Sequence, residues 1–210
     1  MNNPKQIVRV GLLTLLLLML SACGSSAFSE TFDDTGSWGV GQAADVSGAV
    51  TGGVYDFYVE SSRGSFWSTA GQNLADGTYT VEATQIDGPV DNGYGMIFNA
   101  DMDQDNFYLF EVSSDGYVWI GRCEAGCQEE TVLVDRDWFA SDAIRQGVNE
   151  TNTLRVDVLE GDMVFYVNGL QVGRAFDNTY SSGDVGVFVE TIGEGGLRVH
   201  FDNYDYTPAE

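Results

Sequence analysis

After its first 27 residues, the chain shows the alternation of apolar and polar residues that is typical of β-strands. Tyr79, Val81 and Ala83 alternate with polar residues, and the same period recurs in residues 154–158 and 197–201. Each segment therefore places its apolar side chains on one face and its polar side chains on the other. The pattern predicts antiparallel strands with one buried face, repeated along an all-β domain.

Short turns separate the predicted strands. Asn168-Gly169 lies between the apolar segments 163–167 and 170–173, and Asn-Gly favours the type I′ turn of a two-residue β-hairpin. Residues 136–146 lack a strand pattern, and we expect a loop with a helical turn there. Because the chain contains no internal repeat and no proline-rich linker, we predict a single domain.

The N-terminus has the three zones of a secretory signal. Lys5 and Arg9 provide positive charge, residues 10–20 form an apolar run, and small residues follow at Ser21 and Ala22. Such a run is too short to span a bilayer as a stable helix. The pattern predicts export from the cytoplasm.

The sequence Leu-Ser-Ala-Cys at residues 20–23 resembles the lipobox of bacterial lipoproteins. The resemblance implies that residues 1–22 are removed as a signal peptide and that Cys23 carries a diacylglycerol. Residues 23–27 would then be a polar tether. Acyl chains, at about 0.8 kcal/mol per buried methylene, would anchor the protein to a lipid bilayer outside the cytoplasm. The alternative is an ordinary secretory signal with a chance cysteine.

The chain is strongly acidic, with 9 basic and 32 acidic residues. Loss of Lys5 and Arg9 with the signal would leave 7 arginines, no lysine and a net charge of −25. A surface so negative repels phosphate backbones and anionic lipid headgroups, which excludes nucleic acid as a partner. Solubility explains the excess of acidic residues, and adaptation to salty surroundings is a second interpretation.

Six segments together resemble the concanavalin A-like and laminin-G-like domains. The most specific is Tyr-Val-Asn-Gly at residues 166–169, which follows an Asn-x-Leu-Arg-Val strand. The resemblance covers residues 28–206, leaves 207–210 as a tail, and implies an antiparallel two-sheet β-sandwich, a jelly roll. That fold occurs in lectins, glucanases and interaction modules, and some relatives carry a structural calcium, for example near Asp202. The six segments are residues 91–98, 105–112, 152–156, 165–169, 183–187 and 201–204.

Besides Cys23, the chain contains Cys123 and Cys127, in the sequence Cys-Glu-Ala-Gly-Cys. Outside the cytoplasm two nearby cysteines most simply form a disulfide. A metal site would need more soft ligands, and the chain offers only His200 besides. We therefore predict a Cys123–Cys127 disulfide that rigidifies a short loop.

The sequence displays no catalytic motif of this fold. Glucanases with the jelly roll carry Glu-x-Asp-x-x-Glu on one strand, which places a nucleophile and an acid on one face. The segment that begins at Glu111 has a second acid only at Asp115, where the strand ends in a turn. With 32 acidic residues in the chain, a close carboxylate pair on adjacent strands stays an open alternative.

Two other polar features have simple explanations. Asp101, Asp103 and Asp105 have the spacing of a calcium loop, but the loop glycine and the final glutamate are missing, which favours a solvated turn. His200 alternates with the apolar residues of its segment, so it faces away from the core, and no nucleophile motif accompanies it. We therefore expect no cofactor apart from the structural calcium that the resemblance allows.

Aromatic residues supply the clearest indication of binding. If residues 114–116 form a three-residue turn, Val118 faces the core, and Tyr117 and Trp119 point to the opposite face beside Glu111. A turn of two or four residues would exchange the faces. Aromatic rings beside a carboxylate on an outer sheet face suit sugar binding. We predict Tyr117, Trp119 and Glu111 as ligand-binding residues.

Three functions remain open at this point. The first, which we favour, is a lipid-anchored, non-catalytic binding module for an uncharged or cationic glycan or a cell-envelope partner. The second is a glycan-cleaving hydrolase, and the third is a structural lipoprotein without a small ligand. In the third case residues 136–146, with Trp138 and Phe139, would cover Trp119. Trp67 is assigned to the core.

Overall fold

A computed structural model describes residues 26–34, 38–39, 41–42, 44–135 and 137–210. Within these residues it contains sixteen strands and no helix, and hence no helix long and apolar enough to cross a membrane. The predicted cleavage site and Cys23 lie outside the described residues.

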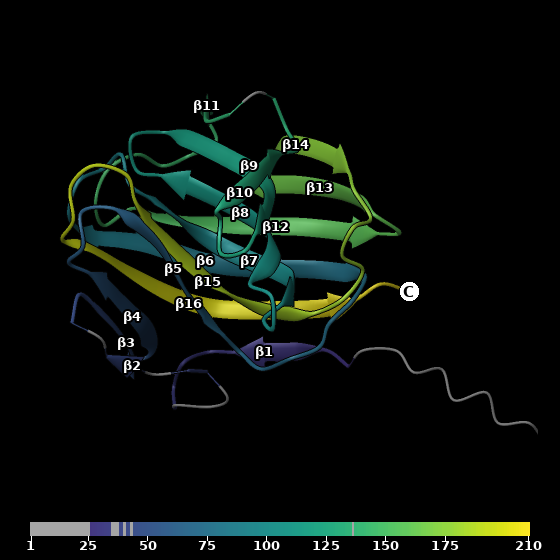
Figure 1. The fold of residues 1–210 in the computed structure, drawn as a ribbon, viewed down its shortest axis with the longest axis horizontal. Helices are drawn as coiled ribbons and strands as arrows, with labels where there is room; N and C mark the ends of the chain where they lie inside the picture. Colours follow the sequence, from purple (N-terminus) through teal and green to yellow (C-terminus); the bar gives the residue numbers. More distant parts are fainter. Residues whose placement is uncertain (1–25, 35–37, 40, 43, 136) are drawn as a thin grey trace, which may run out of the picture.

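The strands form two antiparallel sheets, of which the larger has nine strands. Figure 1 shows its ladder from β14 at the top of the view to β2 at the bottom, with β1 pairing with β16. In ladder order the strands are β14 (Leu170–Phe176), β13 (Asp162–Val167), β12 (Thr151–Leu159), β6 (Gly77–Asp87), β16 (Leu197–Pro208), β4 (Val54–Val59), β3 (Val46–Thr51) and β2 (Gly41–Gln42), with β1 (Phe28–Glu30) off this path.

The second sheet has seven strands and packs against the first (Figure 1). Its ladder is β10 (Glu129–Val132), β9 (Tyr117–Glu124), β8 (Asn106–Ser113), β7 (Gly93–Asp101), β15 (Asp184–Thr191) and β5 (Gly64–Thr69), and β11 (Phe139–Ala140) pairs with β9. This arrangement confirms the predicted antiparallel two-sheet β-sandwich. At its C-terminal end β16 continues to Pro208, two residues past the predicted end of the domain, because Thr207 and Pro208 pair with β6.

The main core lies between the two sheets. Tyr79, Val81 and Ala83 of β6 are fully buried there, as the alternation predicted. The rings of Phe110 in β8 and Phe165 in β13 meet edge-on at a centroid distance of 5.3 Å and so join the sheets. Full burial of one such side chain contributes about 1.5–3 kcal/mol. The Asn168-Gly169 turn also forms as predicted, with positive φ at both residues.

The segment 136–146 differs from its prediction, because no described part of it is helical. It contains the short strand β11 and a turn that Asn152 holds in place. The buried amide of Asn152 accepts a hydrogen bond from the backbone N–H of Arg145 at 2.9 Å and donates one to its carbonyl at 3.0 Å. Asn168 donates to the carbonyl of Ala143 at 2.8 Å. These side-chain bonds hold the segment together with a backbone turn bond, from the N–H of Ile144 to the carbonyl of Ser141 at 3.3 Å.

Candidate functional site

The strand register confirms the predicted faces of the β8–β9 hairpin. Val112 lies opposite Val118, and Glu111 lies opposite Trp119. The valines belong to the core between the sheets, whereas Trp119 belongs to a second apolar cluster on the outer face of the seven-stranded sheet. We call this second group the outer cluster; its buried members are Ile97, Ala100, Phe107, Leu109, Trp119, Cys123 and Phe188.

Trp119 is buried, so the expectation of an open stacking ring at this position is wrong. Its side chain is only 3% exposed, and Val132 and Trp138 pack against the outer cluster to which it belongs. The ring lies over Gly121, where an added Cβ would collide with it. The segment 136–146 contributes Trp138 to this cover, while Phe139 packs against the main core instead.

Of two other aromatic residues, Tyr117 has the exposed position that the sequence predicted, whereas Trp67 lies outside the core to which it was assigned. Tyr117 is 42% exposed, opposite Ala140 of β11, and it does not line the pocket described below. Trp67 packs against the outer cluster, with its ring 5.4 Å from that of Phe107, and so lies outside the core between the sheets. Both outcomes depend on which distant segments cover the outer face.

A pocket of about 350 Å³ opens over the outer cluster. Trp138, which is half-buried, forms part of its wall, and Glu111 and Trp119 line it as well. Two of the three predicted ligand-binding residues therefore share one pocket. The lining residues are Arg63, Gly64, Leu109, Glu111, Trp119, Cys127, Glu130, Asp137, Trp138, Phe188, Glu190, Thr191 and Ile192.

The predicted disulfide between Cys123 and Cys127 is confirmed, and it borders this pocket. The loop that it closes is tied to the β7–β8 turn, because Ala125 N–H donates to Asn106 Oδ1 and Gly126 N–H donates to the carbonyl of Asp105, both at 2.9 Å. The disulfide loop thus turns the chain from β9 into β10, which brings Glu130 to the pocket.

Glu111 is a buried carboxyl without a complete set of partners. It is 2% exposed, and its Oε2 accepts no hydrogen bond within the described structure. The carboxyl lies above Gly93, where an added Cβ would collide with Oε2 and lie 3.1 Å from Cη2 of Trp138. Burial raises the pKa of Glu111 well above its ordinary value, and the charges of Glu190 and Glu130 add to the rise.

Glu190 of β15 is the second carboxyl of the pocket, and the sequence analysis missed it. Burial raises its pKa from 4.5 to about 7, Glu130 adds to the rise, and a hydrogen bond with Ser65 opposes it. Strand β7 separates it from Glu111, since Glu190 pairs with Gly93 and Glu111 with Gly95. Strand spacings of about 4.8 Å and a rise of about 3.4 Å per residue put the two Cα atoms roughly 12 Å apart on one face.

The carboxylates of the pocket are too widely spaced to hold a metal ion together. A calcium site brings six to eight oxygens to about 2.3–2.6 Å from the ion. Among the described residues, the only group of three potential ligands within 4.8 Å is Cys123, Cys127 and Glu130, and its two cysteines are joined in the disulfide. Among the described residues, the pocket therefore brings no three carboxylates close enough together to ligate one ion.

The other polar candidates lie elsewhere. Asp101 caps the β7–β8 turn, since its carboxylate accepts bonds from the N–H of Asp103 at 3.1 Å and from Gln104 Nε2 at 3.2 Å. His200 of β16 lies on the nine-stranded sheet, 3.6 Å from Asp56 Oδ1. Burial raises the pKa of Asp202, and Glu82 adds to the rise. None of these residues lines the pocket over the outer cluster.

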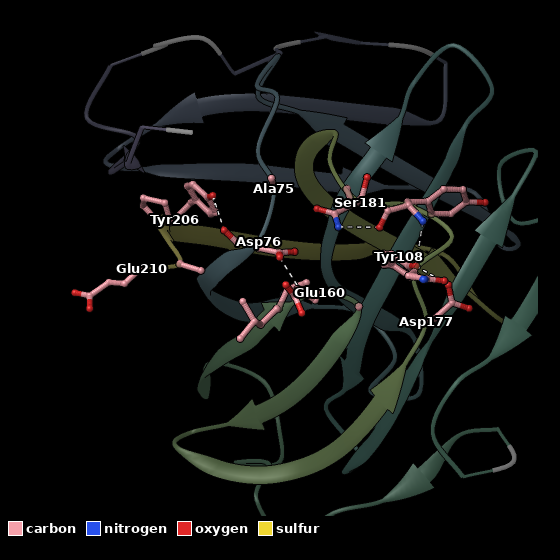
Figure 2. A pocket seen from close by; sticks show the side chains of 16 residues that line it. Ala75, Asp76, Tyr108, Glu160, Asp177, Ser181, Tyr206 and Glu210 are labelled. Atoms are coloured by element: carbon pink, nitrogen blue, oxygen red, sulfur yellow. Dashed lines mark hydrogen bonds between the residues drawn. The ribbon is translucent and has the colours of Figure 1, made fainter. Parts of the chain in front are cut away.

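A larger cavity of about 650 Å³ lies beside the C-terminal end of β16. Figure 2 shows Asp76, Glu160 and Tyr206 on one side of it and Tyr108 and Asp177 on the other. Tyr108 donates to Asp177 at 2.6 Å and Glu160 N–H donates to Asp76 at 2.8 Å, and no described lining residue has a buried side-chain polar atom without a partner. The smaller pocket contains buried polar atoms that lack such partners, so it is the better candidate for a ligand site.

No family model matches the sequence, and no curated protein matches it either. Solved structures do resemble the fold. A carbohydrate-binding module, CBM66 from Bacillus subtilis, superposes with a TM-score of 0.65 at 20% identity, covering 82% of this chain and 96% of the module. The Bacillus licheniformis β-glucanase superposes with a TM-score of 0.61 at 15% identity, covering 88% of this chain and 99% of the enzyme.

A β-1,3-1,4-glucanase (lichenase) derived from a mouse hindgut metagenome is similar to the same extent. The superposition has a TM-score of 0.62 at 12% identity, and it covers 88% of this chain and 100% of the lichenase chain. These likenesses show that the chain has the jelly-roll β-sandwich fold found in carbohydrate-binding modules and glucanases. At such identities they show the fold alone, because one fold hosts both binding proteins and enzymes.

Proposed function

We propose that this protein is a lipid-anchored, extracytoplasmic module that binds carbohydrate in the pocket over the outer cluster. The observation that carries the proposal is the half-buried Trp138 beside Glu111 Oε2 and Thr191 Oγ1, two buried polar atoms without hydrogen-bond partners. The neighbouring folds named above support it, since they include a carbohydrate-binding module.

The chemistry of the pocket suits a sugar ring. The C–H face of a sugar packs on an aromatic ring, and its hydroxyls need polar partners at the edges of the ring. Trp138 provides the ring, and Glu111, Glu190 and Thr191 provide the partners. The volume of about 350 Å³ falls at the lower end of the range of small-ligand sites, about 300–1,000 Å³.

Replacing Trp138 with alanine is expected to weaken glycan binding about 5- to 30-fold, because the ring contributes about 1–2 kcal/mol of stacking and apolar contact. A glycan array identifies the ligand, and calorimetry on wild-type and variant protein measures the loss. Trp138→Phe should lie between the two, since it keeps a smaller ring.

Tyr117→Ala is the matched control, because Tyr117 is an exposed aromatic residue outside the pocket. It should leave the affinity unchanged. If Trp138→Ala bound the glycan as wild type does and Tyr117→Ala lost binding, the site would lie at Tyr117, and the proposed pocket would be wrong.

Cleavage of the glycan is a second candidate function, favoured by the presence of Glu111 and Glu190 in one pocket. A carboxyl that stays protonated at neutral pH can serve as a general acid. Against cleavage, the sequence lacks the Glu-x-Asp-x-x-Glu strand that places a nucleophile and an acid on one face in the jelly-roll glucanases. Mass spectrometry of the bound oligosaccharide after long incubation should show an unchanged chain length. Shortened products that Glu111→Gln abolishes would establish a hydrolase.

Membrane attachment through Cys23 is part of the proposal and rests on the Leu-Ser-Ala-Cys sequence. Mass spectrometry of the membrane-extracted protein should show an N-terminal cysteine with acyl chains, and Cys23→Ser should move the protein into the soluble fraction. A Cys23→Ser protein that remains fully membrane-bound would contradict lipid anchoring. The net charge argues against nucleic acid as a further partner.

A further inference from the structure

We propose that the pocket over the outer cluster selects a positively charged sugar, namely an oligosaccharide of amino sugars with free amines. The sugar ring stacks on Trp138 and places its ammonium group between Glu111 and Glu190. This inference rests on the proposed carbohydrate binding and adds the chemical class of the ligand.

The charges around the pocket are almost all negative. Glu111, Glu190, Glu130 and Asp137 line it from four separate segments, namely β8, β15, β10 and the segment before β11. Arg63 is the one basic lining residue, and it takes part in none of the ion pairs between described residues. Among the described residues, the lining therefore carries a surplus of carboxyl groups that take part in no ion pair.

Glu111 indicates which kind of ligand would compensate the surplus of carboxyl groups. An acceptor atom that is buried without a partner costs the folded protein about 1–3 kcal/mol. Glu111 Oε2 is such an atom, at the wall of the pocket, and Thr191 Oγ1 is another. A ligand that donates hydrogen bonds removes this cost on binding. An ammonium group donates up to three and brings a positive charge as well.

Repulsion among the carboxylates points to the same ligand. Burial raises the pKa of both Glu111 and Glu130, and the charges of Glu190 and Asp137, respectively, add to these rises. One bound cation relieves these repulsions together. No three of these carboxylates lie within 4.8 Å of one another, whereas an ammonium group on a stacked ring needs only one or two of them.

The test compares two oligosaccharides of equal length and linkage, a glucosamine hexamer and an N-acetylglucosamine hexamer. Acetylation removes the positive charge and also adds an acetyl group, so the effect of Glu190→Gln distinguishes charge from size. Calorimetry with the purified protein at physiological salt should show the free-amine hexamer binding at least tenfold more tightly. Glu190→Gln should remove most of this preference, and Trp138→Ala should weaken both hexamers.

Affinity for the free amine should also fall on both sides of neutral pH. The complex pairs a protonated amine with an ionised Glu190, so the two groups together hold one proton. The other charged residues that line the pocket are Glu111, Glu130, Asp137 and Arg63. At low pH both groups carry a proton before binding, and at high pH neither does. The N-acetylated hexamer should not show the alkaline fall.

Two controls separate this inference from general attraction to an acidic protein. Glu129→Gln removes one exposed charge outside the pocket and should leave the preference intact. Pentalysine should bind weakly and independently of Trp138. Equal or tighter binding of the N-acetylated hexamer, or equal binding of pentalysine, would overturn the inference while carbohydrate binding stands. If no glycan binds in a Trp138-dependent manner, the proposed function fails as well.

Discussion

Replacing Trp119 with alanine is expected to destabilise the protein by about 3–5 kcal/mol, the usual cost of removing a buried indole from a packed cluster. Trp119 lies under the cover formed by Val132 and Trp138, and its ring fills the space above Gly121. The surrounding strands are hydrogen-bonded on both sides of β9, so they cannot close the cavity that the substitution leaves. We therefore expect the substitution to act mainly on stability, and any loss of binding to follow from the loss of stability.

Chemical denaturation with a tryptophan-independent probe, such as circular dichroism, measures this loss. Trp119→Phe should recover much of the stability, because it keeps an apolar ring in the cluster. Tyr117→Ala serves as the control on the same hairpin, and since Tyr117 is exposed it should change the stability by less than about 0.5 kcal/mol. Equal stability of Trp119→Ala and wild type would show that the outer face is open.

Replacing Glu190 with glutamine is expected to stabilise the protein by about 2–3 kcal/mol above neutral pH and to change little at pH 4.5. The pKa of Glu190 rises from 4.5 in the unfolded chain to about 7 in the folded protein. A carboxyl with a raised pKa favours the folded state below its unfolded value, and this contribution is lost as the pH rises through 7. The size follows from about 1.4 kcal/mol per pKa step, reduced for solvent screening.

Wild-type stability should accordingly decline between about pH 4.5 and pH 7, and the variant should show a flatter profile. Glu111→Gln should act in the same direction, because burial raises the pKa of Glu111 as well. The lowered pKa of Asp162 and Asp177 acts at lower pH and in the opposite sense, so it does not obscure this range. Glu129→Gln controls for the net charge. A parallel pH profile for Glu190→Gln and wild type would contradict the assigned burial.

The alternation of apolar and polar residues was sufficient to predict antiparallel strands with one buried face, and the resemblance to concanavalin A-like domains added the two-sheet jelly roll. A strand exposes alternate side chains to opposite faces, so Tyr79 and Val81 could be assigned to the core from their spacing alone. The Asn168-Gly169 hairpin could be predicted for a similar reason, since few residue pairs accept positive φ at both positions. The disulfide followed from two cysteines four residues apart in a chain that the sequence predicts to be exported.

The same local rules placed Trp119 and Glu111 on one face but could not say what covers that face. Val132 and Trp138, which follow the disulfide loop, pack against the outer cluster that contains Trp119, and no period in the sequence encodes this packing. The alternation distinguishes two faces of a strand, whereas exposure depends on segments that fold over the strand later. Trp67 was misplaced for the same reason.

Glu190 shows most clearly what only the tertiary structure decided. Its strand β15 alternates regularly, with Val187 and Val189 in the core, so its outward direction was predictable in principle. Its position near Glu111 was not, because that depends on β7 lying between β15 and β8. Local backbone geometry determines which way a side chain points. Strand order, burial and mutual charge repulsion arise from contacts between distant segments, and these turn two separate glutamates into one site.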